Sequence, residues 1–322
     1  MSTELTYLAA ARSALEGAMS SDERIAILGE DVGEGGPFGL TKDLASRFGD
    51  ERIRNTPISE GGVMGVAIGM ALGGMHPVVD LMFNDFITLA SDQLFNHAAK
   101  LHFMSGGRLR VPLTVWTVGG AGTRWGAQHS QRLEGWLIQV PGLKVLAPST
   151  AETMAASMSA ALQTDDPVIV FADRSLLYQR GNSISGSSTS PWRSRIVKEG
   201  NDVTLATCGR LLPMAYDLAT RNASPSIEVI DLQVLAPMDV DTILRSVERT
   251  GRLLIVHEGG TNGSVADVIA ARVADAGFWS LDAPIRRVVP PATPVPAAPN
   301  LEDSYMIGEE QILSAIQELM AQ

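Results

Sequence analysis

Residues 56–81, TPISEGGVMGVAIGMALGGMHPVVDL, contain the two patterns that decide the fold. Residues 60–72 have the apolar spacing of a helix, and residues 77–81 form the short apolar run of a buried strand. The most apolar part, residues 63–79, contains four glycines, His76 and Pro77. It therefore predicts a buried helix that leads into a strand, not a membrane span.

The alternation of strand and helix continues on both sides of this stretch, which is typical of a mainly parallel sheet with helices on both faces. Ser149, followed three residues later by Glu152, predicts a capping box at the start of the last helix of this series. Strands are predicted at residues 25–28, 77–81, 111–118, 144–147 and 168–171, and helices at about 6–19, 60–72, 86–103 and 151–163.

A change of composition divides the chain. Residues 181–190, GNSISGSSTS, have almost nothing to bury, which predicts a linker. We predict an α/β protein with a first domain over residues 1–180, a linker over 181–195 and a second domain over 196–322. In the second domain, strands are predicted at 203–207, 227–232, 253–257 and 285–289, helices at 211–221, 240–249, 265–274 and 309–320, and an extended proline-rich arm at 290–296.

The overall composition excludes several classes of protein. The chain has 322 residues, which favours two domains, and its net charge of -11 argues against nucleic acid as a partner. The single cysteine, Cys208, excludes an internal disulfide, and its apolar surroundings predict a buried strand. The first residues lack the basic-then-apolar layout of a signal peptide, so we expect a cytoplasmic protein without a membrane anchor.

The common catalytic fingerprints are absent from the sequence. The glycines at 33–39 and 119–122 match neither G-x-G-x-x-G nor the phosphate-binding P-loop pattern, and no G-x-S-x-G elbow is present. The five histidines show no zinc-ligand spacing. These patterns alone predict only a two-domain α/β protein of enzymatic type.

Three further segments carry a family resemblance. They are TPISE at residues 56–60 before the glycine-rich helix, NHAAK at 96–100 leading into MSGG at 104–107, and QHSQ at 128–131 before PGLKV at 141–145. In this order and spacing the chain resembles the β subunits of the pyruvate, branched-chain 2-oxoacid and acetoin dehydrogenase complexes. The resemblance continues through residues 161–167 and the tail at 282–303, so it covers essentially the whole chain.

The resemblance implies two doubly wound domains, a transketolase-like pyrimidine-binding domain followed by a transketolase C-terminal domain. It also implies thiamine diphosphate as cofactor, shared between two subunits. In this family the β subunit holds the aminopyrimidine, whereas the α subunit holds the Mg²⁺ diphosphate through a Gly-Asp-Gly…Asn motif. The nearest match here is Gly49-Asp50-Glu51, which lacks the third glycine and the asparagine. We therefore expect an α subunit as partner, a second copy of this chain in a complex of two α and two β subunits, and a lipoyl acyltransferase or carrier protein as acceptor.

By the same resemblance, three residues are candidates for the site. Glu60 would hydrogen-bond a ring nitrogen of the aminopyrimidine and so help remove the thiazolium proton. Phe86 would pack against the aminopyrimidine, and His129 would lie near the reacting carbon, where an imidazole can donate to a carboxylate or oxyanion. The structural alternatives are an acid that stabilises a helix N-terminus, a core phenylalanine and a structural histidine.

The resemblance also suggests a potassium site, because several relatives bind K⁺ in the loop that corresponds to residues 161–166. A helix C-terminus followed by an ordinary turn is the structural alternative. Oxygen ligands, largely backbone carbonyls, suit such a hard cation. The candidate ligands are Leu113, Ala161, Leu162, Thr164 and Asp166.

Some positions depart from the family pattern. Gln233 replaces an arginine that many relatives have in an Asp-Leu-Arg-Thr sequence, and the segment at 116–120 lacks the arginine usually found there. The substrate therefore stays open among pyruvate, branched-chain oxoacids, acetoin and ketose phosphates. Two alternatives are the β-type half of a split transketolase-like enzyme that transfers a two-carbon unit to a carrier, and a non-catalytic scaffold for an α-like subunit.

Overall fold

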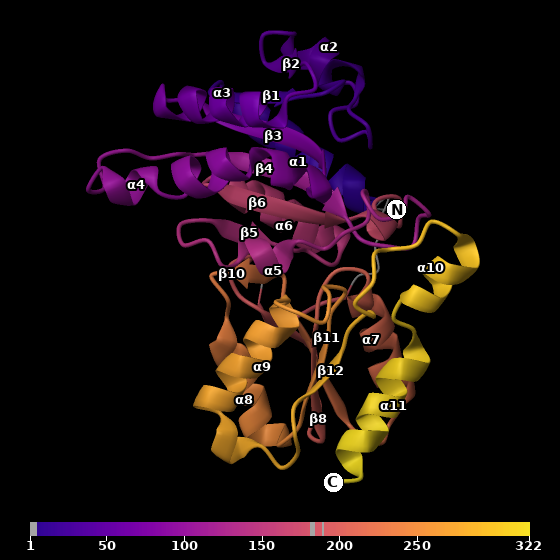
Figure 1. Cartoon of the computed structure of the whole chain (residues 1–322). Helices are drawn as coiled ribbons and strands as arrows, with labels where there is room; N and C mark the ends of the chain where they lie inside the picture. Colours follow the sequence, from indigo (N-terminus) through magenta and orange to yellow (C-terminus); the bar gives the residue numbers. More distant parts are fainter. Residues whose placement is uncertain (1–4, 181–183, 189) are drawn as a thin grey trace.

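Two α/β units are stacked along the long axis of the molecule in the computed structural model, which describes residues 5–180, 184–188 and 190–322 (Figure 1). The first unit has a seven-stranded sheet in the order β10-β5-β6-β4-β3-β1-β2, and the second has a five-stranded sheet in the order β12-β11-β8-β9-β7. The strand pairs are parallel except for β10 with β5 and β7 with β9. The predicted fold class, with mainly parallel sheets, is confirmed.

The elements of the first unit follow the predicted alternation closely. Its strands are β1 (Ile25–Gly29), β2 (Ile53–Asn55), β3 (His76–Phe83), β4 (Thr114–Gly119), β5 (Lys144–Leu146) and β6 (Val168–Asp173). Its helices are α1 (Tyr7–Ser21), α2 (Leu44–Phe48), α3 (Glu60–Leu72), α4 (Leu101–Met104), α5 (Glu134–Leu137) and α6 (Ala151–Ala161), with shorter turns η1 (Val32–Glu34), η2 (Asn84–Ala90), η3 (Gln93–Ala98) and η4 (Arg174–Leu176).

The second unit begins at β7 and ends with the last helix of the chain. Its strands are β7 (Arg195–Lys198), β8 (Val203–Thr207), β9 (Ile227–Asp231), β11 (Leu253–Val256) and β12 (Arg286–Val288), while β10 (Val234–Ala236) crosses into the first sheet. Its helices are α7 (Leu211–Arg221), α8 (Val240–Thr250), α9 (Val265–Ala276), α10 (Pro299–Tyr305) and α11 (Glu309–Met320), with the turn η5 (Phe278–Ser280). The domain boundaries stay a prediction, and β10 shows that the second half of the chain also builds the first sheet.

Three apolar cores hold these layers together. One lies between the first sheet and helices α1 and α6, and another between the second sheet and helices α7 and α11. The third is continuous across both units, because it joins α3 and its face of the first sheet to α8, α9 and their face of the second sheet. The two units therefore share buried apolar surface, which favours a fixed mutual orientation. Within the described residues, no helix is long and apolar enough to cross a bilayer.

The stretch predicted as one helix at residues 86–103 is helical, but it is not a continuous α-helix. This stretch forms a 3₁₀ turn η2, a π-helical turn η3 and the short α4. Asn84 and Asp85, at the start of the stretch, bond to Gln131: Asn84 Nδ2 donates to the Gln131 carbonyl at 2.8 Å, and Gln131 Nε2 donates to Asp85 Oδ1 at 2.8 Å. These tertiary bonds fix a tighter turn, and apolar spacing of three to four residues does not distinguish it from an α-helix.

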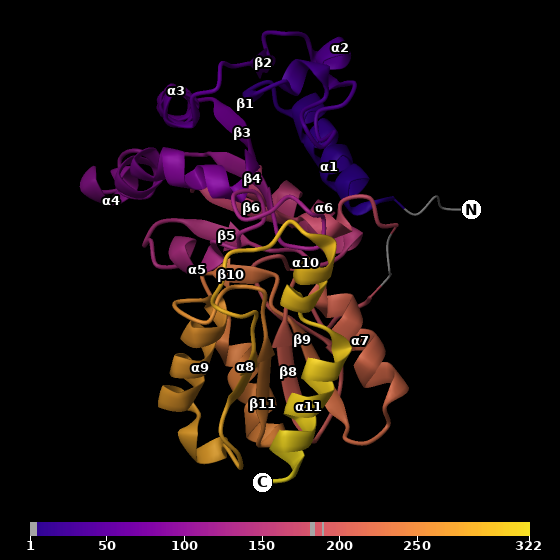
Figure 2. The ribbon, with the colours of Figure 1, turned by 45° about the vertical axis from the view of Figure 1, so that its right-hand side comes forward.

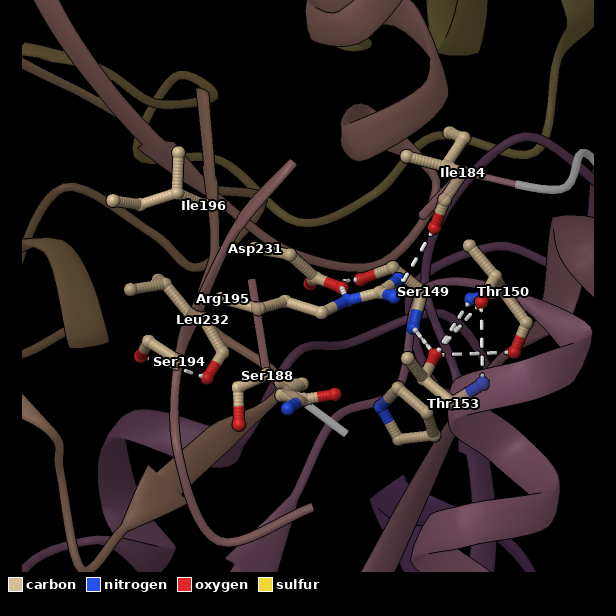
Figure 3. A network of polar contacts seen from close by, with 12 residues as sticks. Ser149, Thr150, Thr153, Ile184, Ser188, Ser194, Arg195, Ile196, Asp231 and Leu232 are labelled. Atoms are coloured by element: carbon tan, nitrogen blue, oxygen red, sulfur yellow. Dashed lines mark hydrogen bonds and ion pairs between the residues drawn. The ribbon is translucent and has the colours of Figure 1, made fainter. Parts of the chain in front are cut away.

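The predicted capping box at Ser149 is also wrong by one residue. Thr150 is the N-cap of α6 and accepts from the Thr153 amide at 3.2 Å. Ser149 instead donates from Oγ to Asp231 Oδ1 of the second unit at 2.7 Å (Figure 3). The sequence could not reveal this, because the competing acceptor lies in another unit.

Buried ion pairs lie at the junction of the two units: the pair of Asp231 with Arg195 is within the second unit, and that of Arg132 with Glu258 crosses between the units. Asp231 pairs with Arg195 at 3.0 Å, and Arg195 Nη1 also donates to the Ile184 carbonyl at 3.1 Å (Figure 3). Nearby, the Arg132 guanidinium lies 2.8 Å from Glu134, 3.2 Å from Asp173 and 3.7 Å from Glu258 of the second unit. Opposite charges in close contact offset the desolvation that each would suffer alone.

Candidate active site

A pocket opens at the carboxyl ends of β1 and β3, where parallel sheets usually bind ligands. Glu60 is the first residue of α3 and reaches this pocket from the helix N-terminus, where a negative charge is favourable. Phe86, in η2, forms another part of the wall. The residues lining the pocket are Gly29, Glu30, Thr56, Pro57, Ile58, Ser59, Glu60, Val63, Val79, Asp80, Leu81, Met82 and Phe86.

The pocket suits one face of a flat heteroaromatic ring. Phe86 offers an aromatic surface, Val63 and Leu81 are apolar, and Glu60 is a hydrogen-bonding acid. The space for the centres of water molecules is only about 30 Å³, room for roughly two waters. Ile58 at the pocket is 76% exposed, so the pocket is open to solvent on this side.

His129 lies next to the pocket wall, in the loop after β4. Its ring packs edge-to-face on Phe83 at 4.7 Å and on Phe86 at 5.7 Å between centroids. His129 does not line the pocket itself, but Phe86 connects it to the pocket that contains Glu60. The three candidate residues are thus brought to one edge of the first sheet.

Comparisons with known proteins agree with this arrangement. Family models of the transketolase pyrimidine-binding domain and the transketolase C-terminal domain match residues 3–179 and 193–312. The chain is 41% identical over 329 residues to the β subunit of acetoin:2,6-dichlorophenolindophenol oxidoreductase from Bacillus subtilis (strain 168), covering 97% of this chain and 96% of that protein. It is 37% identical to the β subunit of the pyruvate dehydrogenase E1 component from Rickettsia bellii (strain RML369-C), with 98% of each chain covered.

The chain belongs to the β-subunit family of the thiamine-diphosphate-dependent 2-oxoacid dehydrogenases. A solved structure described as a split-gene transketolase, an inactive β4 tetramer, superposes with a TM-score of 0.76 over 98% of both chains, at 20% identity. That likeness shows the shared fold. Family membership implies thiamine diphosphate as the cofactor, and the residue types of the pocket suit one face of an aminopyrimidine ring.

Asp80 is a residue of this β-subunit pocket that sequence reasoning missed. It lies near the end of β3, is only 6% exposed, and accepts from the Met82 amide through Oδ1 at 3.0 Å. Burial raises the pKa of Asp80 to about 6, although the Met82 bond acts in the opposite direction. An acid in an apolar strand run, the VVDL at 78–81, was the available signal.

Arg174 is a second missed residue, located directly after β6. Its guanidinium lies over the rings of Phe38, Phe83 and Trp125 at 5.5, 4.9 and 4.1 Å, and Nη1 donates to the His129 carbonyl at 3.1 Å. No carboxylate of the described residues lies within ion-pair distance of it. Burial therefore lowers the pKa of Arg174 to about 10. The aromatic faces supply the attraction that a carboxylate would otherwise give.

Gln233, which replaces the arginine of many relatives in this family, lies away from the pocket. It is buried with a backbone φ of 34°, and its Nε2 donates to the Ser190 carbonyl at 2.9 Å. Its side chain therefore ties the linker to the second unit within this chain. Gln233 therefore contributes to packing within the chain and does not line the pocket.

The candidate potassium ligands do not form a free set of oxygens. Lys144 Nζ lies 2.8 Å from Asp166 Oδ2 and 3.2 Å from Thr164 Oγ1, and the Leu113 carbonyl accepts from the Val168 amide at 2.8 Å. An ammonium beside two of the ligands disfavours a second cation there. Ala161 and Leu162, at the end of α6, would have to supply most of the coordination, and the potassium site stays a prediction. Among the residues that the structure describes, no cluster of three or more His, Cys, Asp or Glu could hold a metal ion.

Proposed function

We propose that this chain is the β half of an enzyme of two α and two β subunits that decarboxylates a 2-oxoacid or cleaves acetoin and passes the acyl group to a lipoyl group. One observation carries the proposal: Glu60 and Phe86 line one open pocket at the carboxyl edge of the first sheet. The relatives named for acetoin and pyruvate support the two substrate classes. The acyltransferase partner is inferred from the reaction, since a lipoyl group needs a carrier.

In this proposal, Phe86 orients the aminopyrimidine and Glu60 hydrogen-bonds its ring nitrogen. Glu60 would thereby hold a proton at that nitrogen and favour the tautomer that takes the thiazolium proton. When bound, thiamine diphosphate supplies the electron sink that cleavage next to a carbonyl requires. His129 would donate a hydrogen bond to the substrate carboxylate or to the oxygen on which negative charge develops.

The α subunit would supply the Mg²⁺ diphosphate half of the site. The sequence lacks the Gly-Asp-Gly…Asn motif, and the pocket is too open to retain a cofactor alone. A second copy of this chain would pair with the first to complete the tetramer. Obligate interfaces of this kind usually bury more than about 2,000 Å².

The test compares the purified chain with the complex reconstituted from both subunits. With Mg²⁺ and thiamine diphosphate, the chain alone should reduce no artificial electron acceptor in the presence of pyruvate, branched-chain oxoacids or acetoin. The complex should turn over at least one of them. Light scattering should give the mass of two α and two β subunits. Turnover by the chain alone, or a stable complex of one α and one β subunit, would contradict the proposal.

A further inference from the structure

The loop between β4 and His129 has a backbone conformation that its own residues do not fix. Gly120, Gly122 and Gly126 have φ values of 103°, 99° and 74°, and Arg124, which is not glycine, has φ 66°. Glycine adopts such conformations freely but also many others, so ordering this loop has a large entropic cost. An external group must hold the loop in place.

Glu302, in α10 of the second unit, is one such group, in addition to Arg174, which donates to the His129 carbonyl. Its carboxylate is fully buried, accepts from the Gly122 amide at 2.8 Å and from the Arg124 amide at 3.0 Å, and pairs with Arg124 Nη1 at 2.9 Å. Figure 2 shows α10 above α11, next to the first unit. Bonds from amides to a charged acceptor are among the stronger ones in proteins. One side chain therefore fixes two backbone positions of the loop.

The loop connects this attachment to His129. Trp125 directly follows Arg124, whose amide binds Glu302. The Trp125 ring lies 5.4 Å from the Phe83 ring and 6.2 Å from the His129 ring, measured between centroids. The His129 amide in turn donates to the Gly126 carbonyl at 3.4 Å. Displacement of residues 122–126 would therefore shift the imidazole relative to the pocket.

We propose that Glu302 is a positioning residue: the second unit holds the loop of the first so that His129 meets the substrate in a fixed place. This inference rests on the role of His129 in the proposed function. It assigns no contact between Glu302 and substrate or cofactor. A small displacement of a catalytic group can reduce turnover about a hundredfold.

The experiment uses Glu302→Gln in the full chain, with Asp303→Asn as the matched control. Asp303 is the next residue of α10 and pairs with Arg124 Nη2 at 2.6 Å, but it is exposed and bonds to neither amide. Hydrogen–deuterium exchange is measured on the purified chain, and steady-state kinetics on the complex with the α subunit. In Glu302→Gln, the amides of Gly122 and Arg124 should exchange about ten- to a hundredfold faster.

In the complex, the turnover number of Glu302→Gln should fall about ten- to a hundredfold. Exchange of the cofactor's thiazolium proton should stay within about twofold of wild type, because the pocket of Glu60 and Phe86 is untouched. Asp303→Asn should resemble wild type in every measurement. If Glu302→Gln fails to fold, Arg124→Met, which removes the ion pair with Glu302 but keeps the two amide bonds, should give a smaller change in the same direction.

Wild-type turnover and loop protection in a folded Glu302→Gln variant would overturn the inference. So would an equal loss of turnover and of thiazolium exchange, because that pattern indicates general destabilisation. An inactive wild-type complex with every substrate would instead count against the proposed function, and the amide exchange would still report whether Glu302 holds the loop.

Discussion

The pocket edge of the first sheet and the junction between the two units differ in whether their charged side chains are paired. At the junction, Asp231 and Arg195 are almost fully buried and paired at 3.0 Å. At the pocket, Glu60 is half-buried and makes no side-chain bond to any of the described residues. The charges of Asp231 and Arg195 are paired within the chain, whereas the carboxylate of Glu60 is left for a ligand. An unpaired acid thus lies at the pocket edge, and a paired one at the junction between the units.

The largest expected effect comes from Glu60→Gln in the reconstituted complex. Glutamine keeps the size and can hydrogen-bond, but it cannot exchange a proton with the ring nitrogen. The turnover number should fall about a hundred- to ten-thousandfold, with assembly and Tm nearly unchanged. Exchange of the thiazolium proton is the direct measurement. If the variant exchanges this proton at the wild-type rate, Glu60 does not activate the cofactor and only stabilises the N-terminus of α3.

The junction should respond in stability instead. Asp231→Ala leaves Arg195 buried without its partner and removes the acceptor of Ser149, so the free energy of unfolding should fall by about 3–5 kcal/mol. Asp22→Asn, which breaks the exposed pair with Arg24, is the matched control and should change it by less than about 1 kcal/mol. Urea unfolding of the chain measures both. An equal loss of unfolding free energy in the two variants would show that the buried pair contributes no more to stability than the exposed pair.

Asp80 tests whether a titratable group of the pocket also makes the free energy of unfolding depend on pH. Its pKa is raised to about 6 in the folded chain, so the folded state binds the proton more tightly. Its contribution is fully present below about pH 4 and is lost as the pH rises through 6, a change of about 3 kcal/mol. Unfolding free energies of wild type and Asp80→Asn from pH 4 to 7 should diverge by this amount. Parallel curves would show that Asp80 has an ordinary pKa.

The smallest expected effect is on cofactor affinity in Phe86→Leu. Leucine keeps an apolar wall but removes the aromatic face, a contribution of about 0.5–1.5 kcal/mol. The Kd of the complex for thiamine diphosphate should therefore rise about two- to tenfold, as measured by calorimetry. Phe95→Leu is the control, because Phe95 packs on Trp136 and does not line the pocket; a similar loss in both variants would indicate a packing effect.

Most of the secondary structure could be predicted from the sequence, because apolar periodicity and strand–helix alternation are local signals. The predicted helices at 60–72, 211–221 and 309–320 match α3, α7 and α11 residue for residue. The failures have non-local causes. The start of the 84–104 stretch is set by bonds to Gln131, and β10 pairs with β5, where Val234 lies opposite Leu146, 88 positions earlier.

The site could be predicted only in part. Glu60 and Phe86 were identified by resemblance, and the structure brings them into one pocket; their roles, and that of His129, stay predictions. Arg174 and Glu302 could not be identified in this way, because their contacts depend on how distant loops meet. Glu302 lies 180 positions after Gly122, and no periodic pattern links the two.

The strand β10 limits how this protein can be recombined. It covers the outer edge of β5 in the first sheet, although it is encoded with the second unit. A hybrid gene joined within residues 181–195 would pair this β5 with a foreign strand, whose register must match Val145 and Leu146. A fragment ending at that point would instead expose unpaired amides and carbonyls along β5. Such an edge promotes pairing with a strand of another molecule and hence aggregation. Successful chimaeras should therefore carry the segment at 234–236 together with the first unit.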